Sequence, residues 1–269
     1  MPNETPPEDL FPPAQRYVYG RSPLVQVILQ LKFLPILKIE SDIPSEFQER
    51  VRSEFPRYQK GAPDNGMRLP VSVAALLQLR PSHQFFSEDS KTTITLTTDA
   101  ISISTTLYKG WSWFRPLCDL ATRALIDVYK PPAFTRIGLR YTDIVVPADL
   151  DLKEIHWSRL LNREMLGEIA NPKFESALSG LCFRVLALRL PGGRGALLFR
   201  HGFGGFPDLP TQPATPHYIL DYDVYNEGKT ESGNEWKVID DYHELASRAF
   251  HWSISPELHD LLRPIEPVG

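Results

Sequence analysis

The chain of 269 residues is 42% hydrophobic and 23% charged, which is the ordinary range of a globular protein and excludes disorder over the whole length. No run approaches the roughly 18 apolar residues of a membrane-spanning helix, so we expect no membrane span. The formal charge of −4 argues against a general nucleic-acid coat, which needs a basic surface to displace counterions. The acidic excess lies in residues 131–269. It suits a protein partner with a basic surface, although a solvated surface without a partner is the commoner explanation.

Residues 1–20 are predicted to form an extended tail, because prolines cluster there. The tail has neither the basic start nor the apolar core of a signal peptide, so we expect a cytoplasmic, bacterial-type protein. Cys118 and Cys182 lie in apolar segments, and neither has a second cysteine or a histidine at metal-ligand spacing. We therefore expect buried free thiols, as is usual for unpaired cysteines.

Hydrophobic periodicity predicts a mixture of strands and helices in the first half of the chain. Residues 25–33 alternate with period two, which is typical of a strand with one buried face. Apolar residues recur every four positions between Asp42 and about Tyr58, which predicts a helix. A longer helical pattern over 111–129 is ended by two prolines. In chain order we expect a strand at 25–33, a helix at 42–58, strands at 71–80, 83–87, 92–98 and 101–107, and a helix at 111–129.

The second half of the chain starts the same kind of series again. A strand is followed by a helical pattern, then by three strands and a second long helical pattern. A Gly/Pro-rich loop spans 201–216, and Ser255 followed by Pro256 predicts the start of a short C-terminal helix. In chain order we expect a strand at 134–146, a helix at 152–169, strands at 175–190, 195–200 and 218–225, and a helix at 235–252.

The common element order predicts an α+β protein built from two pseudo-repeated units. Each unit reads strand, helix, three or four antiparallel strands, helix, and a short C-terminal helix follows the second unit. We expect the halves 21–130 and 131–269 to pack as a single compact unit. TATA-binding-protein-like and helix-grip folds use this element order, which is an analogy of fold and carries no function.

Several segments occur in an order that is shared with a known family. They are SPLVQVILQLKF (22–33), PSEFQERVRSEFP (44–56), RIGLRYTDIVVP (136–147), HG (201–202), LDYDVY (220–225), His243, Phe250 and SISPELHDLLRP (253–264). In these the chain resembles a sporadically distributed bacterial family of about 250 residues, whose biochemistry is not established. After GLRY such proteins tend to have an Asn-containing segment, where this chain has Thr142-Asp143, so we assign that position no role. The resemblance implies a soluble protein from mobile-element or defence neighbourhoods, without a cofactor.

Two carboxylates, Asp221 and Asp223, stand two residues apart on a predicted strand, so both project from one face. Like charges at this spacing are costly unless a cation, an arginine or water meets them. Together with His201 or His243 they form a candidate site for a divalent metal ion. The structural alternative is an ion pair with Arg140 or Arg200, and solvent exposure is the third.

The remaining candidate residues each have a structural alternative. Arg140 could bind a carboxylate or phosphate through its planar fork, but an arginine among acidic strands is usually an ion-pair partner. His243 falls on the apolar side of its helix, which favours a core histidine over a base or ligand. Trp111 and Trp113 open a helix, so one must face outward if the other packs inward, and an exposed tryptophan would suit an interface. The chain has no GxSxG nucleophile motif, so we assign no catalytic residue.

Our first hypothesis is a non-enzymatic interaction or accessory protein. It would be a regulatory, inhibitor or sensor subunit of a prokaryotic defence operon, CRISPR-associated systems included, or of a toxin–antitoxin-type operon. Its partner would be a co-encoded protein, and a homodimer is compatible with this role. One alternative is a helix-grip protein with a ligand cavity lined by Trp111, Phe114 and strand residues. The other is a metal-dependent hydrolase or nuclease that uses Asp221 and Asp223. Nucleic-acid binding is disfavoured, because the strands show Thr, Ser and Gln rather than clustered Lys and Arg.

Overall fold

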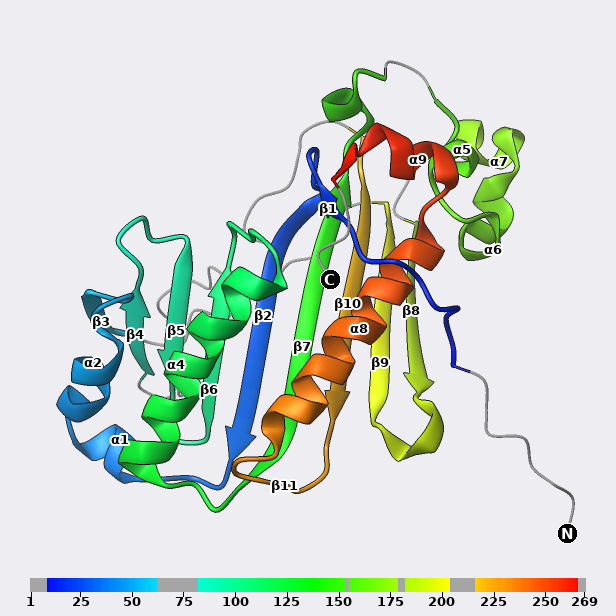
Figure 1. The fold of residues 1–269 in the computed structure, drawn as a ribbon. Helices are drawn as coiled ribbons and strands as arrows, with labels where there is room; N and C mark the ends of the chain where they lie inside the picture. The colour runs from blue at the N-terminus through cyan, green and yellow to red at the C-terminus, as the bar shows by residue number, and fades with distance from the viewer. Residues whose placement is uncertain (1–8, 62–81, 153–154, 179–181, 204–215, 266–269) are drawn as a thin grey trace, which may run out of the picture.

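The computed structural model describes residues 9–61, 82–152, 155–178, 182–203 and 216–265, and it shows an α+β protein. A large antiparallel sheet forms one layer, and two long helices cross one of its faces (Figure 1). Within the described residues the sheet has ten strands. Their spatial order is β3 (Arg57–Gly61), β4 (Ser82–Phe86), β5 (Thr92–Leu96), β6 (Ala100–Thr105), β2 (Leu24–Phe33), β7 (Ala133–Val145), β10 (Tyr218–Asn226), β9 (Ala196–Phe203) and β8 (Cys182–Arg189), with β11 (Thr230–Glu231) paired to β7.

The two halves of the chain meet where β2 pairs with β7. The last sheet strand of the first half, β6, returns to lie beside β2, and β10 returns in the same way to lie beside β7. On β2 the residues Val27, Leu29 and Leu31 are fully buried, whereas Gln26, Ile28 and Gln30 are half-buried and Lys32 is exposed. This alternation follows from period two, which places every second side chain against the helices.

The long helices α4 (Trp111–Tyr129) and α8 (Glu235–Ser253) cover this face, and the main core lies between them and the sheet. Phe114 and Leu125 of α4, and Tyr242 and Ala246 of α8, are buried in it. The short helices are α1 (Lys38–Ser41), α2 (Ser45–Val51), η1 (Pro147–Leu150), α5 (Trp157–Leu160), α6 (Arg163–Leu166), η2 (Gly167–Ala170), α7 (Pro172–Ala177), η3 (Pro191–Gly193) and α9 (Pro256–Leu261). None of the described helices is long and apolar enough to span a membrane.

The helix expected from Asp42 to about Tyr58 is wrong in its extent. α2 ends at Val51, and the chain continues as the strand β3 from Arg57. Of the apolar residues spaced by four, Phe47, Val51 and Phe55 are buried as expected, but Ile43, which precedes α2, is 71% exposed. Pro56 cannot supply the backbone N–H that a continuing helix needs, so the residues after it are free to pair with β4.

The single helix expected over 152–169 is also wrong. In the described residues the region is divided into α5, α6 and η2, and α7 follows. Asn162 divides it and Asn171 starts α7 just beyond it, because each side chain accepts a backbone hydrogen bond at the start of a new helix. Since α7 takes up Glu175, the strand expected over 175–190 begins only at Cys182.

The other predicted strands and helices of the described residues are present, with small differences at their ends. The Gly/Pro-rich loop expected over 201–216 starts later than predicted, because β9 continues to Phe203. Of the two cysteines expected to be buried, Cys118 is buried and Cys182 is half-buried. α4 spans the predicted range 111–129, and α9 begins after Ser255, whose hydroxyl accepts from the backbone N–H of Leu258. The strand expected at 71–80 and residues 204–215 of the Gly/Pro-rich loop lie outside the described residues. Short strands were not predicted, namely β1 (Val18–Tyr19) with its partner β12 (Pro264–Ile265), and β11.

Residues 9–20, which belong to the predicted extended tail, pack across α8 instead of extending into solvent (Figure 1). Phe11 is only 4% exposed, and its ring centroid lies 5.6 Å from that of Trp252. Asp9 accepts a hydrogen bond from Arg248 at 3.0 Å and also pairs with Arg194. These contacts hold the segment against the helix, where it closes one side of the cavity described below.

Candidate functional site

The predicted carboxylate Asp221 lies in an ion-pair network on the sheet face opposite the long helices. It is fully buried and accepts from Arg140 Nε at 2.6 Å and from Arg200 Nε at 2.5 Å. Thr142 Oγ1 donates a third hydrogen bond at 2.8 Å. Because β7 and β9 supply these donors and β10 supplies the carboxylate, the network joins three neighbouring strands. Asp221 therefore forms ion pairs with both Arg140 and Arg200, which is the alternative to a metal site that the sequence left open.

Asp223 lies on the same face of β10 and is paired with Arg136, whose Nη2 lies 3.0 Å from a carboxylate oxygen. Arg136 also donates to Gln30 on β2 at 3.0 Å, and its guanidinium lies 4.8 Å from the ring centroid of Tyr225. Burial raises the pKa of Asp223, and the neighbouring arginines oppose that rise. Both predicted carboxylates thus have arginine partners.

The two candidate histidines lie on the other face of the sheet, the one that the helices cover. His201 shares a hydrogen bond of 2.7 Å with the hydroxyl of Tyr218, and its ring stacks on Phe199. Burial lowers the pKa of His201 to about 4, which makes this ring neutral near pH 7. Since the histidines and the carboxylates do not converge, the arrangement gives no support to a metal site. No group of three metal-ligating side chains occurs in the described residues.

A cavity of about 270 Å³ lies between the sheet, α8 and the start of α4. The N-terminal segment covers it with residues 16–19 and 22–24. β7 and β10 form its floor through Tyr141, Asp143 and Tyr222, and α8 forms a wall through His243, Ala246, Ser247 and Phe250. Its aromatic side chains come from five separate parts of the chain, and Tyr19, Tyr108, Trp111, Tyr141, Tyr222 and Phe250 are among them.

Two sequence candidates, Trp111 and His243, meet in this cavity. Their rings stack with centroids 4.4 Å apart and planes at 13°. The hydroxyl of Tyr141 lies 2.8 Å from Nδ1 of His243 and shares a hydrogen bond with it. Trp111 Nε1 donates to Asp240 at 3.1 Å, which fixes the indole on α8. Burial lowers the pKa of His243 to about 4, so a neutral imidazole lines the cavity near pH 7.

Asp143 is the cavity residue that the sequence analysis did not select. It lies on the helix-facing side of β7, only 5% exposed, and it lines the cavity. Among the described residues its carboxylate has neither a hydrogen bond nor a salt bridge, unlike Asp221 on the neighbouring strand. Burial raises its pKa well above the usual range of an aspartate, and the charge of Asp221 raises it further. The signal in the sequence is an acidic residue at a position that period two assigns to the buried face, two residues beyond Tyr141.

The other predicted tryptophan, Trp113, lies outside the cavity. Trp113 is half-buried, and its ring centroid lies 6.3 Å from that of Phe114. Lys109 Nζ lies 5.5 Å from the centroid of the Trp113 ring. Arg140 belongs to the network around Asp221. Of the seven candidate residues, the structure thus brings two into the cavity, three into the ion-pair networks, and leaves Trp113 and His201 in separate packing environments.

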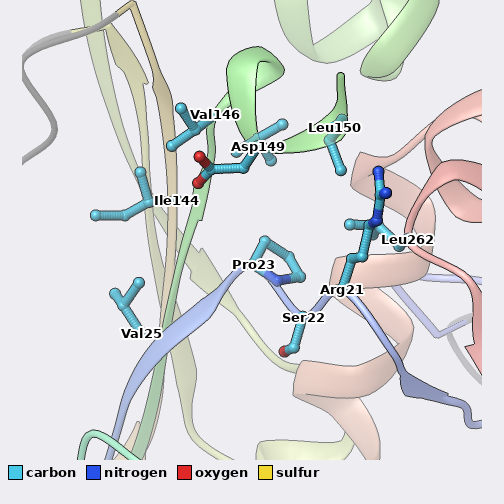
Figure 2. A pocket seen from close by; sticks show the side chains of 10 residues that line it. Arg21, Ser22, Pro23, Val25, Ile144, Val146, Asp149, Leu150 and Leu262 are labelled. Carbon is cyan, nitrogen blue, oxygen red and sulfur yellow. The ribbon is translucent and has the colours of Figure 1, made fainter. Parts of the chain in front are cut away.

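A second hollow of about 530 Å³ lies beside the ends of β2 and β7 (Figure 2). Its walls are mainly hydrocarbon, from Pro23, Val25, Ile144, Val146 and Leu150, as Figure 2 shows. Of its charged groups, Arg21 is paired with Asp151 at 2.8 Å, and Asp149 is exposed to solvent. The larger hollow therefore lacks a buried polar group that a ligand would satisfy, and we place the candidate site in the smaller cavity with Asp143.

Neither the comparison with protein-family models nor the comparison with curated proteins finds a match to this chain. The family resemblance and the role in a defence or toxin–antitoxin operon stay predictions.

Proposed function

We propose that this protein is a small-ligand-binding protein of the helix-grip kind. The observation that carries the proposal is the cavity between the sheet and the start of α4 on one side and α8 on the other. Binding pockets are typically concave and lined by aromatic side chains, with a few polar groups that fix the orientation of the ligand. Here the aromatic rings form the wall, and the carboxylate of Asp143 is the buried polar group.

The proposal includes a duplicated α+β unit. The observations that support it are the central β2–β7 pair and the return of β6 and β10 to the first strand of each half. A duplicated unit would place α4 and α8 in corresponding positions over the sheet. The cavity would then lie where the N-terminal end of one such helix approaches the side of the other.

A filled-cavity variant tests the proposed function. Ser247 lines the cavity from α8, so Ser247→Trp would occupy the space with its own side chain. Lys237→Trp is the matched control, because Lys237 lies on the same helix but is exposed. A chemically mixed library of small neutral, cationic and anionic compounds is screened by thermal unfolding against the three proteins.

We expect compounds that raise the unfolding temperature of the wild type and of Lys237→Trp but not of Ser247→Trp. A ligand at about 100 times its Kd contributes about 2.7 kcal/mol to the free energy of unfolding, which is well above the detection limit. Stabilisation that persists in Ser247→Trp places binding elsewhere. A library without any stabilising compound contradicts the proposed function.

An interaction protein is the second candidate function, and one observation favours it. β8 is the last strand of the sheet in the described part of the chain, and it carries exposed apolar side chains, with Phe183 37% and Val185 60% exposed. Edge strands of this kind can pair with another chain. We expect a homodimer that forms through β8 and is lost in Val185→Glu, as measured by light scattering. A wild-type monomer at high concentration contradicts this candidate.

A further inference from the structure

The chemistry of the cavity is set by Asp143, an acidic group that has no protein partner among the described residues. An isolated carboxylate in a buried site is strongly unfavourable unless it is protonated or meets a cation. The two basic residues that line the cavity do not supply that cation. Arg16 is paired with Glu244 at 3.5 Å, and Lys109 lies over the ring of Trp113.

The surrounding rings complement a positive charge. The faces of aromatic rings carry negative electrostatic potential, and tryptophan attracts cations most strongly, followed by tyrosine and phenylalanine. Tyr108 and Trp111 from one segment and Phe250 from α8 line the same cavity as Asp143. A carboxylate inside a group of aromatic rings is the arrangement that recognises organic ammonium ions.

We propose that the cavity binds a small organic ammonium cation, with the carboxylate of Asp143 as its counter-ion and the aromatic rings as its walls. This inference rests on the proposed ligand-binding function and names its ligand class. A volume of about 270 Å³ restricts the ligand to a compact amine or quaternary ammonium group. A hard metal cation fits poorly, because it needs several oxygen ligands. Within the described residues Asp143 belongs to no group of three metal-ligating side chains.

The test compares charged and uncharged ligands of the same shape. Isothermal titration calorimetry measures the binding of tetramethylammonium, choline and benzyltrimethylammonium to the full chain. The uncharged partner of choline is the isostere in which a quaternary carbon replaces the quaternary nitrogen. The variants are Asp143→Asn, which keeps the shape and removes the charge, and Asp223→Asn. Asp223→Asn is the matched control, because Asp223 is also an aspartate of a central strand. Its side chain lies on the opposite face of the sheet, where it pairs with Arg136.

We expect at least one ammonium ion to bind the wild type and Asp223→Asn with similar affinity, and to bind Asp143→Asn about tenfold to a hundredfold more weakly. The neutral isostere is expected to bind the wild type more weakly than choline does. Its affinity for the wild type should not exceed its affinity for Asp143→Asn. Thermal unfolding of each variant confirms that it is folded before titration.

Three results overturn the inference, and each differs from failure of the proposed function. If the isostere binds as tightly as choline, or if Asp143→Asn leaves the ammonium affinity unchanged, the cavity binds ligands without selecting a cation. If no ammonium ion binds while neutral compounds from the library do, the ligand class is wrong and the proposed function stands. If no compound of any charge binds, both proposals fall.

Discussion

The imidazole of His243 lies flat on the indole of Trp111, with the two ring centroids 4.4 Å apart, although the residues are on different helices. The stack joins the first turn of α4 to the middle of α8, on the side where both helices approach the N-terminal segment. Trp111 is fixed a second time by its hydrogen bond to Asp240, which also accepts two hydrogen bonds from Arg115. The cavity therefore has one wall that is held in position before any ligand arrives.

Replacing the two tryptophans by alanine is expected to have unequal effects. Trp111→Ala removes the stack on His243 and the hydrogen bond to Asp240, so we expect a loss of about 3 kcal/mol in the free energy of unfolding. It is also expected to weaken ligand binding, because a cavity wall is lost. Trp113→Ala removes a ring outside the cavity and should leave ligand affinity unchanged. Urea unfolding and calorimetric titration of both variants check this, and an equal loss of affinity in the two would contradict it.

Asp143→Asn is expected to stabilise the ligand-free protein. The pKa of Asp143 is raised in the folded state, so the folded protein holds this proton more tightly than the unfolded chain does. The wild type therefore loses stability as the pH rises above the unfolded pKa of about 4, and the loss continues until the folded pKa is reached. An asparagine has no such dependence.

At pH 7 we expect Asp143→Asn to be more stable than the wild type by about 1–3 kcal/mol, with the difference vanishing towards pH 3. Denaturant unfolding of both proteins across this pH range measures it. A variant that is less stable than the wild type at pH 7 would mean that the carboxylate has a stabilising partner.

The opposite sign is expected for Asp221→Asn. Asp221 is fully buried between Arg140 and Arg200, so removing its charge takes away the carboxylate that both guanidinium groups contact. Breaking a buried pair in this way costs about 3–5 kcal/mol. The equivalent change at Asp223, whose side chain is 20% exposed, should cost clearly less. Equal losses for the two variants in urea unfolding would show that the network around Asp221 is not a buried unit.

Acidification is expected to destabilise the protein through His201 and His243. Burial lowers the pKa values of His201 and His243 to about 4, below the unfolded value of about 6.5. Their contribution to stability is therefore complete above about pH 6.5 and is lost progressively as the pH falls towards 4. His243→Phe should reduce this pH dependence. NMR titration of the ring protons measures both pKa values, and a normal value for either would contradict this account.

Much of the fold could be predicted because its elements have strong local signals. The helix over 111–129 and the strand over 25–33 have clear periodicity, and two prolines end the helix. The region 152–169 misled the prediction, because its apolar residues fit one helix as well as several short ones. The side chains of Asn162 and Asn171 decided between them by capping separate helices.

The site was harder to predict than the fold. The sequence indicated Trp111 as a possible interface residue and His243 as a core histidine, so it did not predict that their rings would stack. Period two places Asp143 on the same face as Tyr141, but periodicity alone does not show whether a polar residue on that face has a partner or lines a cavity. Its importance arises only from the burial around it, and no local pattern reports burial by distant segments.

The sequence by itself determined which face of each strand and helix is apolar, since side-chain periodicity depends only on neighbouring residues. It also placed Asp221 and Asp223 on one face of a strand. Only the tertiary structure decided that arginines from neighbouring strands would neutralise these two carboxylates and that Asp143 would face an aromatic cavity without a described partner. The walls of that cavity come from segments around residues 16–24, 108–112, 141–143 and 243–250, and packing brings them together across more than half of the chain. The free energy of a buried charge depends on all of these surroundings at once, which is why it could not be predicted from the position of Asp143 in the sequence.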